Sequence, residues 1–484
     1  MKRFCILLLL LAITHTAHLR ADEHRTYSSR SFMFTKPAYY DIVQEQALWH
    51  DVVYNKKGSV LGGLQFIPFY QRSMSLNNSK KYFLINKKTE LLVAGDNNIA
   101  ALPVRDVRAE WLGINNGEFQ GNLTINPRQE QFGFVLEYSQ DLKKWLDVMF
   151  IRDMYISVIA PFCSVSNNLH LRQFNVANQG TQFPRNIIEA FNQPSWEFGK
   201  INPRSKRRTN LAELKILLGT SYESRNYLQV NYNSVLVIPI ADKEHPQYLF
   251  DPVVGNNHHM GIGAALNIQA PLNRDTTHVA FCFFLDLEST ILIRNKQFRT
   301  FDLRDKPWSR FLLMNEETGY EPRTNVPGVN LMTYKAVIKP FNVVDFAMGW
   351  RTKTRNAEFE AGWGIWGHGY ERIDHLKNFD KVFGIAGSEP GTTASRSTIS
   401  FQADNDINNT TGKTVFVPIT PFDLDLTSGA NPGALNFRVF MSAGYINIQR
   451  NHDTIFGAGW SIDLPYKNST VQVWKAWLKL GASF

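Results

Sequence analysis

The chain has few of the features that mark the commonest functional classes. It has 484 residues and three cysteines, too few for a zinc finger or a disulfide-rich scaffold. A membrane-spanning helix needs an apolar run of roughly 20 residues. After the N-terminal apolar run that ends at Ile13, the chain has no run of about that length, so a helical membrane protein is excluded. There is no G-x-S-x-G, no H-E-x-x-H, no P-loop and no G-x-G-x-x-G after a strand. We therefore expect no catalytic residues, no cofactor and no metal site.

Charge and cysteine usage narrow the classes further. The formal net charge of +9 is modest for this length, and no basic helix or stacking motif accompanies it, so we expect no nucleic-acid partner. The longest basic cluster, Arg204 with Lys206 to Arg208, is interpreted as a solvated loop or, alternatively, as a contact for lipopolysaccharide phosphates. Cys163 and Cys282 can pair in an oxidising compartment, although nothing in their positions places them side by side.

The N-terminus has the layout of a secretory signal. Lys2 and Arg3 precede an apolar run from Phe4 to Ile13, and small residues follow up to Ala21. The run is too short to span a bilayer. We interpret residues 1–21 as a signal peptide; a buried N-terminal strand or helix is the alternative.

The last stretch of the chain, VQVWKAWLKLGASF, alternates with a period of two. Trp474, Leu478, Leu480 and Phe484 share one face, and Lys475 and Lys479 share the other, which predicts a strand. A closing strand of this kind that ends in Phe resembles the C-terminal strand of bacterial outer-membrane β-barrels. The resemblance is to a porin-like class, and it implies an antiparallel transmembrane barrel, a bacterial outer-membrane location and assembly by the barrel-assembly machinery through this strand.

Strand-like segments dominate from Gly58 onward, with 44% hydrophobic and 13% aromatic residues spread through a chain of mean hydropathy −0.25. A barrel reconciles these values because it dilutes lipid-facing residues with inward polar ones. We predict an all-β fold with an even strand count of 12 to 18 and a best count of sixteen. The candidate strands are 58–72, 82–94, 118–127, 130–140, 146–160, 211–223, 227–241, 259–270, 278–292, 330–354, 356–368, 381–387, 395–402, 436–449, 454–464 and 470–484.

Connection lengths and faces agree with a barrel. Tight turns such as 352–355 and 450–453 alternate with long connections at 161–210, 293–329 and 403–435, as the short turns and long loops of outer-membrane barrels do. Glycine recurs on the polar faces, as at Gly457 and Gly459, where curved walls use it. The alternation alone leaves a soluble secreted β-protein open, because an apolar face can also point at a core.

In a barrel, the charged residues on the polar faces point into the lumen and select solutes or pair across strands. Arg351 and Glu358 flank a tight turn and are expected to pair. The candidate lumen-facing residues are Glu213, Lys215, Asp286, Glu288, Asp345, Arg351, Glu358, Glu360, Arg438, Asp463, Lys475 and Lys479.

Residues 22–57 precede the barrel pattern, which we place at 58–484. Tyr39 to Tyr54 has apolar residues at helical spacing, with Ile42, Val43, Ala47 and Leu48 among them, which predicts a short helix. This helix either plugs the lumen or its mouth, or belongs to an ordinary periplasmic extension. A plug favours a substrate-gated carrier, similar to fatty-acid transporters, and its absence favours an open porin.

These observations predict a barrel that passes small or amphipathic solutes passively. The alternatives are a structural or adhesin-type barrel that acts through its long loops, and a soluble secreted β-protein. Expected partners are outer-membrane lipids, lipopolysaccharide and small solutes, with a homo-oligomer possible because many porins are trimers.

Overall fold

We describe a computed structural model of the chain. It describes residues 29–49, 62–74, 77–101, 103–142, 154–224, 228–243, 246–273, 279–317, 323–340, 342–374, 376, 379, 381–385, 418–448, 452–466 and 470–484. The predicted signal peptide, 1–21, lies outside these residues, as does candidate strand 395–402. No described helix is both long and apolar enough to cross a membrane.

Twelve antiparallel strands form one closed sheet, because the β5–β6 pairing joins the two ends of the strand order. The first and last strands, β1 and β25, lie side by side with Gly63 opposite Ser483 and Ser73 opposite Val473. The twelve strands are β1 (Gly62–Ser73), β5 (Arg128–Asp141), β6 (Met154–Asn168), β9 (Glu213–Glu223), β10 (Gln229–Pro239), β11 (Gly261–Pro271), β12 (Ala280–Leu292), β18 (Asn342–Lys353), β19 (Ala357–His368), β23 (Ala434–Ile448), β24 (Asp453–Pro465) and β25 (Val473–Ser483).

One further strand, β8 (Lys206–Leu211), pairs with the second half of β6 and lies outside the ring of twelve. It is almost continuous with β9, from which only Ala212 separates it, and the Ala212 N–H donates to Pro161 O at 2.9 Å. The basic residues Lys206 to Arg208 thus lie on a strand, and the interpretation as a loop is wrong for them.

The best count of sixteen strands is wrong, although twelve lies within the predicted range. Candidate segments 82–94, 118–127 and 381–387 do contain strands, namely β2 (Leu91–Ala94), β4 (Gln120–Thr124) and β21 (Val382–Ile385). These strands pair in small separate sheets beyond one end of the barrel. A short alternating segment has the same pattern in either setting, because the period reports only that one face is buried.

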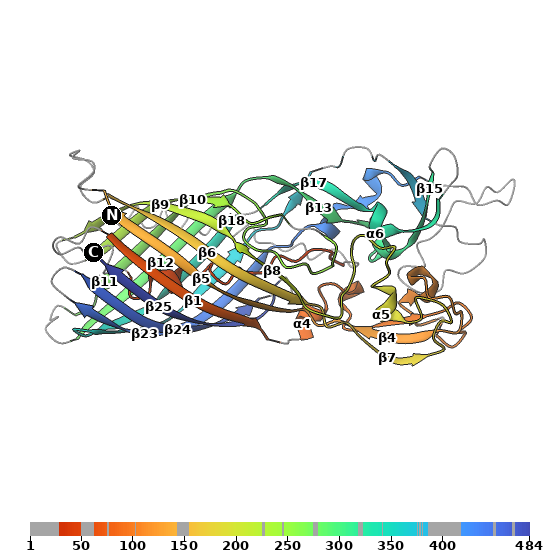
Figure 1. Cartoon of the computed structure of the whole chain (residues 1–484), viewed down its shortest axis with the longest axis horizontal. Helices are drawn as coiled ribbons and strands as arrows, with labels where there is room; N and C mark the ends of the chain where they lie inside the picture. Colours follow the sequence, from red (N-terminus) through yellow and green to blue (C-terminus); the bar gives the residue numbers. More distant parts are fainter. Residues whose placement is uncertain are drawn as a thin grey trace.

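The two ends of the barrel differ. The end that holds Phe484 has the short connections, such as the turn between β18 and β19. The long connections gather at the other end (Figure 1) and form what we call the cap, namely the described residues within 77–127, 169–205, 246–260, 293–340, 369–385 and 418–433. One hydrophobic cluster, which includes Phe83, Phe191, Trp308 and Phe311, draws residues from several of these connections into a common core. The long loops therefore fold together.

The cap holds four small sheets with the strand orders β3-β2-β4-β7, β13-β17-β20, β16-β15-β21 and β14-β22. Its remaining strands are β3 (Val107–Arg108), β7 (Arg172–Ala177), β13 (Asn295–Thr300), β14 (Asp302–Leu303), β15 (Leu313–Glu317), β16 (Arg323–Pro327), β17 (Thr333–Lys339), β20 (Arg372–Ile373) and β22 (Leu424–Asp425). Its helices are α4 (Asn77–Lys80), α5 (Ile187–Ala190) and α6 (Gly328–Leu331), with 3-10 turns η1 (Ile85–Lys87), η2 (Ala109–Leu112), η3 (Ser309–Phe311), η5 (Pro421–Asp423) and η6 (Leu426–Gly429).

The predicted N-terminal helix is much shorter than its pattern suggested. It is α2 (Ile42–Gln46), with Asp41 as the N-cap, whose carboxylate accepts from the Val43 and Gln44 N–H groups. Residues 50–57 of the predicted extension lie outside the described part of the chain.

The barrel wall exposes apolar side chains and buries polar ones, which is the reverse of the arrangement in a soluble protein. Every strand of the ring carries a large apolar residue outward, and these side chains are at least one-third exposed: Leu64, Phe132, Phe162, Leu218, Tyr232, Ile262, Phe281, Trp350, Trp363, Val439, Phe456 and Leu478. Every strand also carries a buried polar residue inward: Gln65, Gln131, Ser157, Lys215, Asn231, Asn267, Asp286, Arg351, Glu360, Arg438, Asp463 and Lys475. An apolar outside and a polar inside are the pattern of a barrel that stands in lipid.

Candidate functional site

Residues 29–49, which we call the plug, run through the lumen from the cap to the short-turn end. At the cap end, the Ser29 hydroxyl donates to Asp302 Oδ2 at 2.6 Å, and the Phe34 N–H donates to Asn431 Oδ1 at 2.9 Å. At the other end, the Trp49 indole N–H donates to Glu137 Oε1 at 3.0 Å. The plug therefore spans the interior and has partners at both ends.

The plug carries three charged side chains into the lumen, and each pairs with the wall. Lys36 Nζ lies 2.6 Å from Asp463 Oδ2. Asp41 Oδ1 lies 2.8 Å from Arg438 Nη1, and Asp41 Oδ2 pairs with Lys475. Because an unpaired buried charge is costly, these pairs fix where the plug lies.

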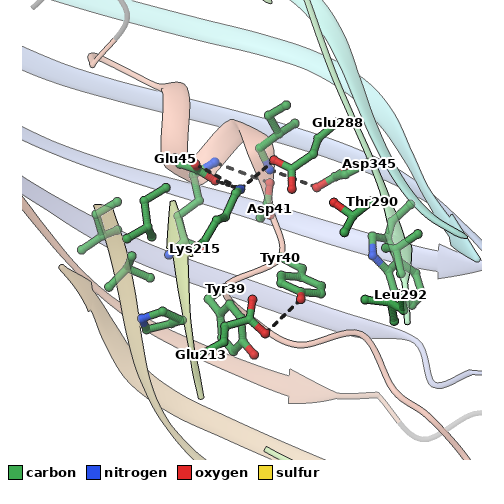
Figure 2. A pocket seen from close by; sticks show the side chains of 18 residues that line it. Tyr39, Tyr40, Asp41, Glu45, Glu213, Lys215, Glu288, Thr290, Leu292 and Asp345 are labelled. Atoms are coloured by element: carbon green, nitrogen blue, oxygen red, sulfur yellow. Dashed lines mark hydrogen bonds and ion pairs between the residues drawn. The ribbon is translucent and has the colours of Figure 1, made fainter. Parts of the chain in front are cut away.

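Glu45 and the wall form the third contact. Lys215 Nζ lies 3.1 Å from Glu45 Oε2 and 2.6 Å from Glu288 Oε2, so one ammonium bridges the plug and the wall (Figure 2). On the same side, the Tyr40 hydroxyl donates to Glu213 Oε2 at 3.1 Å.

Two lysines of β25 hold both ends of α2. Lys475 pairs with the N-cap Asp41. Lys479 donates to Glu45 O at 2.9 Å and to Ala47 O, where the last turn of a helix leaves carbonyls without helical donors. A helix this short has little stability of its own, so the wall contributes much of what keeps it folded.

The plug's last residues fit against glycines of the wall. Leu48 packs against Gly444 and Gly457, and a Cβ on either glycine would clash with Leu48 Cδ1. A Cβ on Gly63 would lie 2.8 Å from Trp49 Cη2. These glycines allow the close approach of the plug.

A cavity remains between the plug and the wall, beside Tyr39, Tyr40, Glu213 and Asp345 (Figure 2). It leaves about 40 Å³ for the centres of water-sized molecules, room for a few waters and no more. The plug thus packs closely against the wall beside this cavity.

Arg438 is the centre of the charged network. Its side chain is fully buried, and it contacts Asp463 at 3.0 Å and Asp345 at 3.1 Å as well as Asp41. Asp345 also accepts the Ile42 N–H at 3.0 Å. Three carboxylates thus share one guanidinium.

The structure places all twelve candidate residues inside the barrel. Eleven are buried, and Glu288 is partly buried. The expected pairing of Arg351 with Glu358 is confirmed at 3.2 Å, and Arg351 also pairs with Glu360. The four residues of the C-terminal pattern face outward, with Leu478, Leu480 and Phe484 about half exposed.

Sequence reasoning missed the plug's side of the site, namely Lys36, Asp41 and Glu45. Asp41 does carry a signal, because an Asp directly before an apolar helical stretch is a typical N-cap. Its wall partners lie about 400 positions away in the chain, and no local pattern reports them.

Beyond the barrel strands, at the cap end of the plug, Asp302 accepts from Ser29 and pairs with Arg310 at 2.7 Å. Burial raises the pKa of the Asp302 carboxyl, even though Arg310 and the hydrogen bonds oppose that rise.

The disulfide that the two cysteines could form is absent. Cys163 on β6 and Cys282 on β12 are both buried and are not bonded to each other, because β9, β10 and β11 separate their strands in the wall.

No protein-family model matches the chain, and no match was found among curated proteins. Solved structures overlap with it loosely. An outer membrane channel from Pseudomonas putida F1 is 10% identical over 88% of this chain and 97% of that chain, with a TM-score of 0.37. A Pseudomonas aeruginosa FadL homologue is 8% identical over 94% of this chain and 99% of that chain, with a TM-score of 0.32. The transport unit of the Escherichia coli autotransporter AIDA-I is 7% identical over 91% of this chain and 97% of that chain, with a TM-score of 0.29. Overlap this loose assigns no function.

Proposed function

We propose that the protein is a channel of the bacterial outer membrane whose lumen is closed by its own residues 29–49, and that solutes pass when this plug moves. The observation that carries the proposal is the combination of an apolar outer wall with a polar lumen that a tethered segment fills. The apolar wall also speaks against a soluble secreted β-protein, because water would contact most of it.

The presence of the plug distinguishes between two kinds of transport, through an open porin and through a gated carrier. An open porin keeps a water-filled passage, whereas here the charged residues of the lumen are engaged with the plug and with one another. Passage therefore requires a rearrangement, which favours a gated carrier of small or amphipathic solutes. We propose no catalytic role, and no cofactor enters the proposal.

A second candidate function is interaction at the cell surface through the cap. The observation in its favour is that the long connections share a hydrophobic core and four small sheets. A cap of this kind presents a fixed surface to a partner.

The proposed partners follow from the location. Lipid and lipopolysaccharide contact the apolar wall, and Arg207, which is exposed on β8 beside the Phe132 ring at 5.4 Å, is placed to meet headgroup phosphates. The outward face of β25, which ends in Phe484, is the proposed signal to the barrel-assembly machinery. We also propose that the protein can form a homo-oligomer. We propose no nucleic-acid partner.

The test is solute entry into proteoliposomes, followed as swelling in a small neutral solute. The wild type is compared with Lys36→Ala/Glu45→Ala, which removes two plug charges. We expect slow swelling for the wild type and fast swelling for the variant. Equally fast swelling of both would indicate an open porin, and swelling of neither would favour the surface-interaction function.

A further inference from the structure

The acidic residues of the wall keep partners outside the plug, on the wall itself or in the cap. Glu288 pairs with Lys215, and Glu358 and Glu360 pair with Arg351. Asp345 and Asp463 pair with Arg438. Among the remaining acids, Glu137 accepts from Gln65, Glu213 from Asn256 and Asp286 from Asn267. These contacts do not depend on the plug.

Lys475 and Lys479 differ from every one of these residues. Lys475 donates to Ala38 O at 3.2 Å and to Gln44 Oε1 at 3.0 Å, and it pairs with Asp41. Lys479 donates to Glu45 O and Ala47 O. In the described part of the chain, all the oxygen acceptors recorded for these two lysines belong to the plug. On the wall, the centre of the Trp477 ring lies 5.1 Å from Lys475 Nζ.

Movement of the plug therefore leaves a specific set of donors in the lumen. Arg438 keeps Asp345 on Nη2 and Asp463 on Nε, and its Nη1, which holds Asp41, is released. Lys475 Nζ is released beside it. Both groups converge on one carboxylate in the closed state, at a point where their side chains are at most 2% exposed.

We propose that Arg438 and Lys475 form a carboxylate-binding site for which Asp41 is a tethered stand-in, and that small organic carboxylates are the solutes that displace the plug. This inference rests on the proposed function, because it names the solute class that the same lumen takes. An incoming carboxylate replaces the Asp41 oxygens on Arg438 Nη1 and Lys475 Nζ. Lys479, four residues along the same face, lies roughly 13 Å further along the strand and offers the next donor.

The chemistry favours a carboxylate because the site already holds one. A charge-assisted contact from a guanidinium and an ammonium to two oxygens is strong where water is excluded. The tether gives Asp41 a high effective concentration, so a free carboxylate competes only weakly in the wild type. Removal of the Asp41 charge should therefore strengthen binding.

The experiment is calorimetric titration of sodium succinate into the purified full-length protein in detergent, for the wild type, Asp41→Asn, Asp41→Asn/Lys475→Gln and Asp41→Asn/Lys339→Gln. We expect Asp41→Asn to bind succinate at least tenfold more tightly than the wild type, and the added Lys475→Gln change to reverse this gain. Lys339 lies on β17 in the cap and pairs with Asp374, so its loss controls for the loss of one positive charge. A heat-dependent gel shift confirms that each variant is folded.

Three results would overturn the proposal: no succinate binding to folded Asp41→Asn, binding that survives Lys475→Gln, or equal binding of sodium sulfate, which would show a general anion site. Ion current through Asp41→Asn separates this inference from the proposed function. Current without succinate binding refutes only the carboxylate site. Succinate binding without current refutes the channel and leaves the site standing.

Discussion

Asp41 of the plug and Lys475 of β25 form an ion pair inside the barrel, where both side chains are almost completely buried. They are 434 positions apart. The pair joins a segment that precedes the first strand to the strand that closes the barrel. The plug is thus held by contacts that exist only once the ring of strands is complete.

Arg438→Met is expected to destabilise the protein strongly. The change leaves Asp41, Asp345 and Asp463 buried without their shared guanidinium, and loss of one partner from a buried pair costs about 3–5 kcal/mol. The measurement is the temperature at which the folded gel band converts to the unfolded one. Arg185→Met, which removes an exposed pair with Glu189 in the cap, is the control and should change it little. Equal conversion temperatures for the two variants would contradict the role of Arg438.

Gly457→Leu is expected to open the lumen without changing any charge. Its side chain would occupy the space of Leu48, so the last part of the plug must move, and ion current in a planar bilayer should rise above the wild-type value. Ala458→Leu places the same side chain on the exposed outer face of the same strand and should leave the current unchanged. A closed Gly457→Leu channel would show that Leu48 does not help to seal the lumen.

Acid is expected to loosen the connection that precedes β11. His259 Nδ1 hydrogen-bonds Ile293 O and Nε2 faces Gln297 Nε2, each at 2.8 Å, and Asn257 fixes the orientation of the Gln297 amide. This set of partners fits a neutral imidazole with its proton on Nδ1. Burial lowers the pKa of His259 to about 4.

The direction of this pH effect follows because the pKa of His259 in the unfolded chain is about 6.5. Stability from neutral His259 is fully present above pH 6.5 and is lost as the pH falls toward 4, by about 3 kcal/mol in total. Hydrogen exchange of residues 256–260, corrected for its intrinsic pH dependence, should rise through this window, and His259→Gln should abolish the trend. A flat profile in the wild type would refute the assignment.

Reductant is expected to have no effect on folding. Because Cys163 and Cys282 are not bonded to each other and lie on strands that are not neighbours, the oxidised and reduced proteins should migrate alike and unfold at the same temperature. Cys163→Ser/Cys282→Ser is the comparison. A mobility shift that only the wild type shows on reduction would reveal a disulfide and contradict the strand order.

The wall could be predicted from the sequence because period-two alternation fixes which side chains share a face. Asp345 and Arg351, or Lys475 and Lys479, point inward for this reason. The number of wall strands could not be predicted, since β2, β4 and β21 alternate like wall strands but pair inside the cap. For residues 22–57 the sequence left two alternatives, a plug and a periplasmic extension. The helical spacing of Ile42, Val43 and Ala47 predicts a helix but not its place, which depends on ion pairs with distant residues such as Arg438.

The most direct test of the central claim, that residues 29–49 close the lumen, is ionic current through a planar bilayer with wild-type protein and then with Asp41→Ala. The account predicts a folded but silent wild type and stable current steps for Asp41→Ala, because Arg438 and Lys475 then lose the carboxylate that holds the plug. Steady current through the wild type, equal to that of the variant, would contradict it.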